Sequence, residues 1–230
     1  MFVRMGLLRK KQEHSSEEFQ AYWRDHHGPL AAQVPHLKCY WQNVVTERLQ
    51  RGIDFTRGPW DFDGISQLWL ESDQPAAGFR NGTLAATLIE DENKFIGQLH
   101  IVGADQRAVI PVPAALERAT LMKRMSTLRR KAGTSEEEFR REWLVHGELV
   151  KKMPGVAGYR QNVIVERELV KGELCGYDDL PIDGIVELWF ADAGSLSAAF
   201  ASPQGQETMA HAKTFLEEIT AFVVEERQVK

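Results

Sequence analysis

The strongest constraint on this chain is that it contains one pattern of residues twice. The segment EEFQAYWRDHHGPL at 17–30 returns as EEFRREWLVHGELV at 137–150. Trp23 pairs with Trp143 at an offset of 120 positions, the offset falls to 119 for Tyr40 and Tyr159, and it returns to 120 further on. An internal repeat decides the architecture, because each copy must form the same unit. The sequence therefore predicts two homologous units, each about half of the 230 residues.

The boundary between the units is predicted from composition. The segment PVPAALERA at 111–119 holds two prolines and several small residues, which is typical of a connector. We therefore expect a first repeat at 1–112, a linker at 113–119 and a second repeat at 120–230.

Within each copy, the order of apolar patterns predicts a β-α-β-β-α-β unit. Serine or threonine followed by glutamates and an apolar period near four indicates an N-capped helix after the first strand. Alternating, β-branched runs indicate the strands. The second helix of each copy is expected at 74–96 and at 193–217. This order is the ferredoxin-like motif.

A ferredoxin-like sheet carries its helices on one face, so its other face needs a partner. Two such sheets that face each other bury both bare faces in a shared interior. Joining the copies in one chain makes this pairing intramolecular. We therefore predict an α+β fold in which two ferredoxin-like βαββαβ repeats form an intramolecular dimeric α+β barrel.

Charge and composition exclude several classes of function. The net charge is −5 and acidic residues occur in both halves, so no basic surface is available for nucleic acid or anionic lipid. Cys39 and Cys175 occupy non-equivalent positions and form no CxxC motif, which disfavours a disulfide framework or a thiolate metal site. We found no apolar run long enough to span a bilayer and no signal-peptide pattern. A cytoplasmic location is expected.

The ordered motifs of the first copy resemble one protein family. The string Phe19-x-x-x-Trp23-x-x-x-His27-Gly28-Pro29-Leu30 is followed by Tyr40-x-Gln42-Asn43 and then by Asp63-Gly64-Ile65 ahead of Leu68-Trp69. This combination resembles the EthD family of the dimeric α+β barrel superfamily, and the likeness extends over nearly all of both halves.

The resemblance implies a small barrel protein that is often encoded with catabolic or polyketide pathways and requires no metal or organic cofactor. Relatives on the same fold include methylmuconolactone isomerases, polyketide cyclases and cofactor-free monooxygenases, and haem binding is known elsewhere on this fold. Since one fold hosts many activities, membership of the family does not fix a reaction.

Histidine is the main candidate for chemistry, because it titrates near neutral pH and can act as general acid or base. His27 follows Trp23 by four positions, whereas His146 follows Trp143 by three. His26 has the three-residue spacing, so either His26 or His27 can be the equivalent of His146. His27 could project into the cleft between helix and sheet, or it could cap the C-terminus of its helix; the resemblance favours the functional alternative.

Alternation along the strands selects candidates for ligand binding, because successive side chains point to opposite faces. In GISQLWLE and GIVELWFA, the positions that alternate with the leucines should face the barrel interior. A neighbouring strand in each copy presents two alternating sets, one of which should line a cavity. Glu187 could instead pair with Arg124 or Arg129. The candidate binding residues are Gln67, Trp69, Tyr40, Gln42, Glu187, Trp189 and Tyr159.

These patterns lead to one main functional hypothesis and two alternatives. The first is a cofactor-independent enzyme of isomerase, cyclase or lyase type, in which His27 moves a proton on a small apolar ring or carbonyl compound and barrel-facing polar groups hold its oxygen. A non-catalytic binding or accessory protein and a cofactor-free monooxygenase are the alternatives. A small apolar or aromatic-derived ligand is the expected partner, and the tandem barrel could itself form a homodimer.

Overall fold

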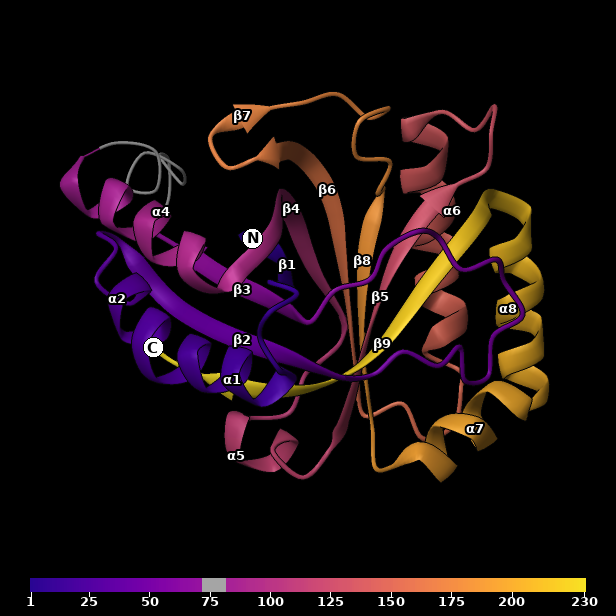
Figure 1. The fold of residues 1–230 in the computed structure, drawn as a ribbon. Helices are drawn as coiled ribbons and strands as arrows, with labels where there is room; N and C mark the ends of the chain where they lie inside the picture. The colour runs from indigo at the N-terminus through magenta and orange to yellow at the C-terminus, as the bar shows by residue number, and fades with distance from the viewer. Residues whose placement is uncertain (72–81) are drawn as a thin grey trace.

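The computed structural model describes residues 1–71 and 82–230, and its elements follow the predicted order in both copies (Figure 1). The first copy contains β1 (Phe2–Lys10), α1 (Ser16–Tyr22), η1 (Trp23–His27), α2 (Gly28–Ala31), β2 (Leu37–Glu47), β3 (Gly64–Leu70), α4 (Thr83–Phe95) and β4 (Ile96–Ile110). After α5 (Ala115–Arg118), the second contains β5 (Met122–Arg130), α6 (Glu136–Val150), β6 (Gly158–Val170), β7 (Glu173–Leu174), β8 (Gly184–Phe190), α7 (Ala193–Ala201), α8 (Pro203–Phe215) and β9 (Leu216–Gln228).

The strands form one closed antiparallel barrel, which confirms the predicted fold. The order is β4-β1-β3-β2-β9-β5-β8-β6, and an additional pairing of β4 with β6 closes the circle. Each copy contributes four strands in the ferredoxin-like order, and the copies meet at the β2–β9 and β4–β6 ladders. In Figure 1 the helices of the first copy lie on one side of the strands and those of the second copy on the other.

The second helical region of each copy is described over different parts of its predicted range. The helix expected at 74–96 is observed from Thr83, and the expected residues up to 81 lie outside the described part of the chain. The region expected at 193–217 contains two helices, because Pro203 lacks the N–H that would continue α7 and instead begins α8. Ser202 caps α8, since its hydroxyl accepts from the Gly205 N–H at 3.0 Å.

The first helix of each copy begins where the sequence predicts. Ser15 and Ser135 form capping boxes with Glu18 and Glu138, so each serine hydroxyl accepts a backbone N–H and each glutamate accepts the N–H of its serine. The predicted linker, 113–119, contains the short helix α5. The domain boundaries themselves stay a prediction.

Each helix packs through its tryptophan onto a glycine of the sheet. A Cβ atom at Gly64 would lie 2.4 Å from the Trp23 ring, and one at Gly184 would lie 2.5 Å from the Trp143 ring. Only glycine allows this approach, which explains why a glycine is repeated at the start of β3 and β8. The tryptophans thereby fix the helix that carries His27 or His146 above the sheet.

Candidate active site

The two copies each enclose a cavity between helices and sheet, on the outer side of the barrel. The first cavity is lined by His27, Tyr40, Arg4 and Ser66 among others, and has a volume of about 50 Å³. The second is lined by His146, Tyr159, Arg124 and Val186 at the equivalent positions, with a similar volume of about 50 Å³. The repeat therefore produces two related sites with different side chains.

The helix that carries His27 contains a π-helical turn, and this turn settles which histidines are equivalent. The residues Trp23–His27 form η1, in which the Gly28 N–H bonds to the Trp23 carbonyl, whereas α6 is α-helical throughout. A one-residue insertion in a helix is accommodated in this way. The extra residue therefore lies before His27. His27 and His146 both line their cavities, while His26 is exposed.

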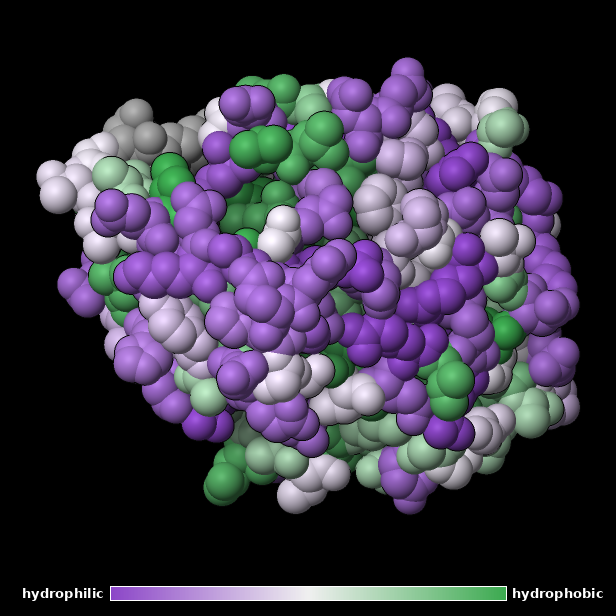
Figure 2. All heavy atoms as spheres, in the orientation of Figure 1, coloured by the Kyte–Doolittle hydropathy of each residue, from purple (hydrophilic) through white to green (hydrophobic). Residues whose placement is uncertain are grey.

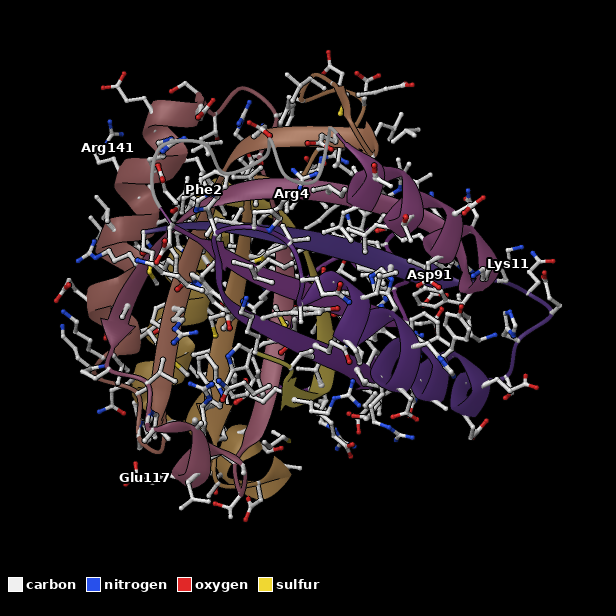
Figure 3. The ribbon with its side chains drawn as sticks, turned by 90° about the vertical axis from the view of Figure 1, so that its left-hand side faces the viewer. Phe2, Arg4, Lys11, Asp91, Glu117 and Arg141 are labelled. Carbon is white, nitrogen blue, oxygen red and sulfur yellow. The ribbon has the colours of Figure 1, made fainter. Side chains whose placement is uncertain are left out.

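His27 is held by a carboxylate from the other helix of its copy. Its Nδ1 lies 2.9 Å from Asp91 Oδ2 on α4, and both side chains are buried. The Tyr22 hydroxyl donates to Asp91 Oδ1 at 2.7 Å. In Figure 3 Asp91 lies where α4 faces the helix of residues 16–27. His27 therefore pairs across two helices and does not cap a helix end.

Burial and the contact with Asp91 define the protonation state of the His27 imidazole. Burial lowers the pKa of His27, against the opposing influence of Glu92 and Asp91, so the ring is neutral at pH 7. Burial works to raise the pKa of Asp91, but hydrogen bonds from Tyr22 and His27 outweigh it and lower that pKa. An ionised carboxylate only accepts, so Nδ1 carries the proton and Nε2 keeps a free lone pair.

Tyr40 is a hydrogen-bond donor in the same cavity. Its hydroxyl oxygen accepts from Trp23 Nε1 at 3.1 Å and from Gln42 Nε2 at 3.0 Å. Burial raises the pKa of Tyr40 to about 12, so the phenol stays protonated at neutral pH. Since both bonds use the oxygen as acceptor, the hydroxyl proton remains available for a guest.

The outer edge of the cavity is formed by an ion pair between the two copies. Lys171 Nζ, from the β6–β7 turn, lies 2.6 Å from Glu92 Oε1 on α4. Both residues also line a surface groove of about 510 Å³, together with Ile89, Leu169 and Val170. Figure 2 shows an apolar hollow in the region between α4 and the β6–β7 hairpin. The groove therefore adjoins the His27 cavity along its outer edge.

The second cavity lacks the carboxylate of the first. His211 occupies the position of Asp91, and its ring stacks on His146 with centroids 5.7 Å apart. Burial and the neighbouring His211 lower the pKa of His146 to about 3. His146 Nδ1 is buried without a hydrogen-bond partner among the described residues. The two copies are therefore chemically unequal.

The barrel-facing candidates lie in a separate compartment from His27. Gln67 Nε2 donates to Glu187 Oε1 at 2.9 Å, and Trp69 and Trp189 are buried beside them. Glu187 pairs with Lys123 at 2.8 Å, not with Arg124 or Arg129 as considered from the sequence. Burial tends to raise the pKa of Glu187, but Lys123 and Arg160 outweigh it and lower that pKa.

The expectation that barrel-facing groups and His27 act on one ligand is therefore wrong. The sheet separates them, because residues that alternate with the leucines point inward while the histidine lies on the outer, helix-covered face. The other predicted set, Tyr40, Gln42 and Tyr159, lies on the outer face: Tyr40 lines the His27 cavity and Tyr159 the His146 cavity. Gln42 bonds to the Trp23 carbonyl at 2.8 Å and supports the helix. The catalytic and binding roles of these residues stay predictions.

The sequence interpretation missed Asp91, although a signal was present. Asp91 lies four positions before Phe95, a repeated aromatic residue, so both share the inward face of the helix. A carboxylate on an apolar face usually has a buried partner. The comparison of the copies places His211 opposite Asp91, so both copies carry a titratable side chain at this position.

No metal-ligating cluster of three or more His, Cys, Asp or Glu residues occurs within 1–71 and 82–230. Helices that could cross a membrane are likewise not found in these ranges.

Comparison with known proteins agrees with the repeat. The EthD domain profile matches residues 11–98 and, a second time, residues 131–219. The chain belongs to the EthD family. It is a tandem member, since one polypeptide carries both domains of the barrel. No curated protein sequence matched this EthD protein.

Solved structures show the same fold at low sequence identity. An anthrone oxidase-like protein is 6% identical with a TM-score of 0.65, over 99% of this EthD protein and 93% of the other chain. A candidate monooxygenase of Lactobacillus acidophilus NCFM is 9% identical with a TM-score of 0.57, over 100% and 94%. A dye-decolorizing peroxidase of Bacteroides thetaiotaomicron VPI-5482 is 6% identical with a TM-score of 0.53, over 97% and 92%. At these identities the likeness concerns the fold alone.

Proposed function

We propose that this protein catalyses a cofactor-independent proton transfer on a small, mainly apolar carbonyl or ring compound bound in the His27 cavity. The observation that carries the proposal is the buried His27–Asp91 pair, with Nδ1 and Oδ2 2.9 Å apart. Asp91 fixes the tautomer that leaves Nε2 as a base, and it stabilises the imidazolium that forms when the base is used. A neutral imidazole in a site of low polarity is a suitable general base near pH 7.

The step that fits these groups is enolisation. His27 Nε2 removes a proton from the carbon next to a carbonyl, the C–H electron pair moves to form the enolate, and the Tyr40 hydroxyl donates a hydrogen bond to its oxygen. The imidazolium then returns the proton to another atom of the same compound. The net result is an isomerisation, or a cyclisation or elimination when the enolate attacks or expels a group.

The proposal is tested by proton exchange, which needs no knowledge of the final product. Lactones and aromatic ketones with an enolisable C–H are incubated with the protein in D2O, and deuterium uptake is followed by NMR. The His27→Gln variant should lose at least ~100-fold in exchange rate, since general-base catalysis contributes ~10²- to 10⁴-fold. Its thermal stability should change little.

Two matched controls locate the effect. His26→Gln changes the exposed histidine next in sequence, and His146→Gln changes the equivalent histidine of the second copy. Both variants should keep the exchange rate of the wild type. Exchange that survives in His27→Gln, or that His146→Gln removes, would contradict the proposed role of the first cavity.

A non-catalytic binding role is the second candidate, and the mainly apolar lining of the cavity favours it. Leu8, Leu68 and Leu88 are among the apolar side chains that line the cavity, and such walls retain an apolar guest without converting it. In that case, the same compounds would bind saturably to the wild type and to His27→Gln, and neither protein would incorporate deuterium.

Oxidation by molecular oxygen is a third candidate, because it begins with the same step, the removal of a proton by His27. Removal of a proton from an electron-rich ring compound yields a carbanion or phenolate, which is the species that reacts with oxygen in the absence of a cofactor. The fold likeness to an anthrone oxidase-like protein is consistent with this role. Oxygen consumption on addition of a compound, lost in His27→Gln, would distinguish it from simple isomerisation.

A further inference from the structure

The second cavity contains a buried arginine at its inner wall. Arg124, on β5, is 3% exposed and lines this cavity together with His146. It is equivalent by the repeat to Arg4, on β1, which lines the first cavity. The two arginines differ in what neutralises them.

Arg4 has a carboxylate partner, and the sequence explains why Arg124 does not. Arg4 donates two hydrogen bonds to Glu168 on β6, at 2.7 and 2.9 Å. The equivalent of Glu168 in the first copy is Leu49, which is 58% exposed. The strand β2 also ends at Glu47, before this position, so the chain leaves the sheet there. The first copy therefore has no carboxylate at the position equivalent to Glu168, and its backbone no longer follows the sheet there.

The contacts that Arg124 makes instead do not neutralise its charge. Its Nη1 donates to the Arg51 carbonyl at 2.8 Å, its Nε lies 3.4 Å from Ser126 Oγ, and the guanidinium packs over the Phe200 ring at 5.1 Å. No ion pair joins Arg124 to an acidic residue within 1–71 and 82–230. Burial lowers the pKa of Arg124 to about 10, which leaves the guanidinium charged at neutral pH.

The rest of the cavity wall is apolar. Most of its lining consists of Leu, Ile, Val, Trp and Phe side chains, and Arg124 is its one charged lining residue among those described. Two flexible residues, Met153 and Met209, also line it. Methionine adapts readily to a guest, so the present volume of about 50 Å³ can increase on binding.

We propose that the second cavity is a binding site for a small monocarboxylate with a short apolar body. The buried guanidinium supplies a planar fork that matches the two carboxylate oxygens, and in a water-poor site such a pair is stronger than at the surface. The apolar walls take the hydrocarbon part. The site is separate from the proton-transfer site proposed for the first cavity. In that cavity the equivalent arginine, Arg4, already pairs with Glu168.

The test uses butyrate and benzoate as probes, each compared with its uncharged amide. In isothermal titration calorimetry at pH 7.5, the wild-type protein should bind one carboxylate per chain, and butyramide and benzamide should bind at least ten-fold more weakly. Arg124→Gln should bind each carboxylate no better than its amide. Arg140→Gln, which removes a surface arginine on α6, should bind as the wild type does.

A second measurement keeps the proposal testable if Arg124→Gln does not fold. In the wild type, the methyl signals of the six methionines are followed by NMR during the butyrate titration, with Met153→Leu and Met209→Leu for assignment. Shifts should be confined to Met153 and Met209. Absence of saturable carboxylate binding, equal affinity for acid and amide, or shifts confined to other methionines would overturn the proposal.

Discussion

At the residue scale, three equivalent positions of the barrel interior carry neutral side chains in the first copy and charged ones in the second. Val3, Gln67 and Gln106 correspond to Lys123, Glu187 and Glu226. Lys123 Nζ lies 2.8 Å from Glu187 Oε2 and 3.1 Å from Glu226 Oε2. The first copy shows that the fold does not require charges at these positions. The ion pairs of Lys123 are therefore specific to the second copy.

We therefore expect substitutions of Lys123 and Glu187 to have strongly non-additive effects on the free energy of unfolding. Lys123→Val leaves Glu187 buried without its main counter-ion and should cost about 3–5 kcal/mol of unfolding free energy. The double variant Lys123→Val/Glu187→Gln restores the neutral pattern of Val3 and Gln67, and should cost at least ~2 kcal/mol less than the sum of the two single variants. Urea denaturation of the four proteins measures this difference. Additive costs would show that the pair is not coupled.

His146 makes stability depend on pH. Its pKa is lowered to about 3 in the folded protein, below the ordinary value near 6.5. Its neutral form is therefore favoured by folding, so stability is complete above pH 6.5 and is lost as pH falls towards 3. His146→Met should match the wild type within ~1 kcal/mol at pH 7.5, and should be about 2–3 kcal/mol more stable than the wild type at pH 4.5.

Denaturation curves at the two pH values provide the measurement for His146→Met. His26→Gln is the control, because His26 is exposed and should not change the pH dependence. If the wild type and His146→Met lose stability in parallel between pH 7.5 and 4.5, the histidine is not responsible for the acid sensitivity.

At the element scale, the π-helical turn shows what the sequence could and could not predict. The offset between the copies changes from 120 to 119 between Trp23 and Pro35, which reveals one extra residue in the first copy. The sequence alone does not show whether this residue precedes or follows the histidine. The structure places it before His27, as η1. The partner Asp91 lies 64 positions away on α4, and only the packing of the two helices brings it to His27.

Deletion of Asp25 should convert η1 into a regular α-helix. The shortened segment would have the three-residue spacing of Trp143 and His146 in α6, so the fold should be kept and the free energy of unfolding should change by less than about 1 kcal/mol. His27 should remain buried, as judged by NMR of its ring. Deletion of Leu144 is the matched control, because it turns the end of α6 by ~100° and should cost more than ~2 kcal/mol. Equal damage from both deletions would contradict the insertion.

At the scale of the whole molecule, the barrel was predictable while the location of the cavities was only partly so. A repeated βαββαβ unit with one bare sheet face leaves few ways to bury that face, which is why the two-copy barrel follows from the pattern alone. Alternation along a strand correctly separates Gln67 and Trp69 from Leu68. It does not say which face keeps free space, because that depends on how closely the helices pack over the sheet. The interior is occupied by a mixed apolar cluster and a polar network, and the cavities lie outside it.

The strand pairing between the copies predicts that the connector is not needed to hold the two halves together once the barrel has formed. The β2–β9 and β4–β6 ladders join the copies directly, and the interior cluster combines Met5 and Ile65 with Ile185 and Phe222. A protease site introduced at Leu116, which is 88% exposed, would allow the chain to be cut after folding. The cut protein should elute as one species in size-exclusion chromatography and unfold in one calorimetric transition.

Cutting should nevertheless change one property. The intact chain holds its halves at an effective concentration of the order of millimolar, and the cut protein does not. Its melting temperature should therefore rise with protein concentration, whereas that of the intact protein should not. Two separate transitions, or two separate elution peaks at micromolar concentration, would mean that each half folds by itself and that the shared interior contributes little to stability.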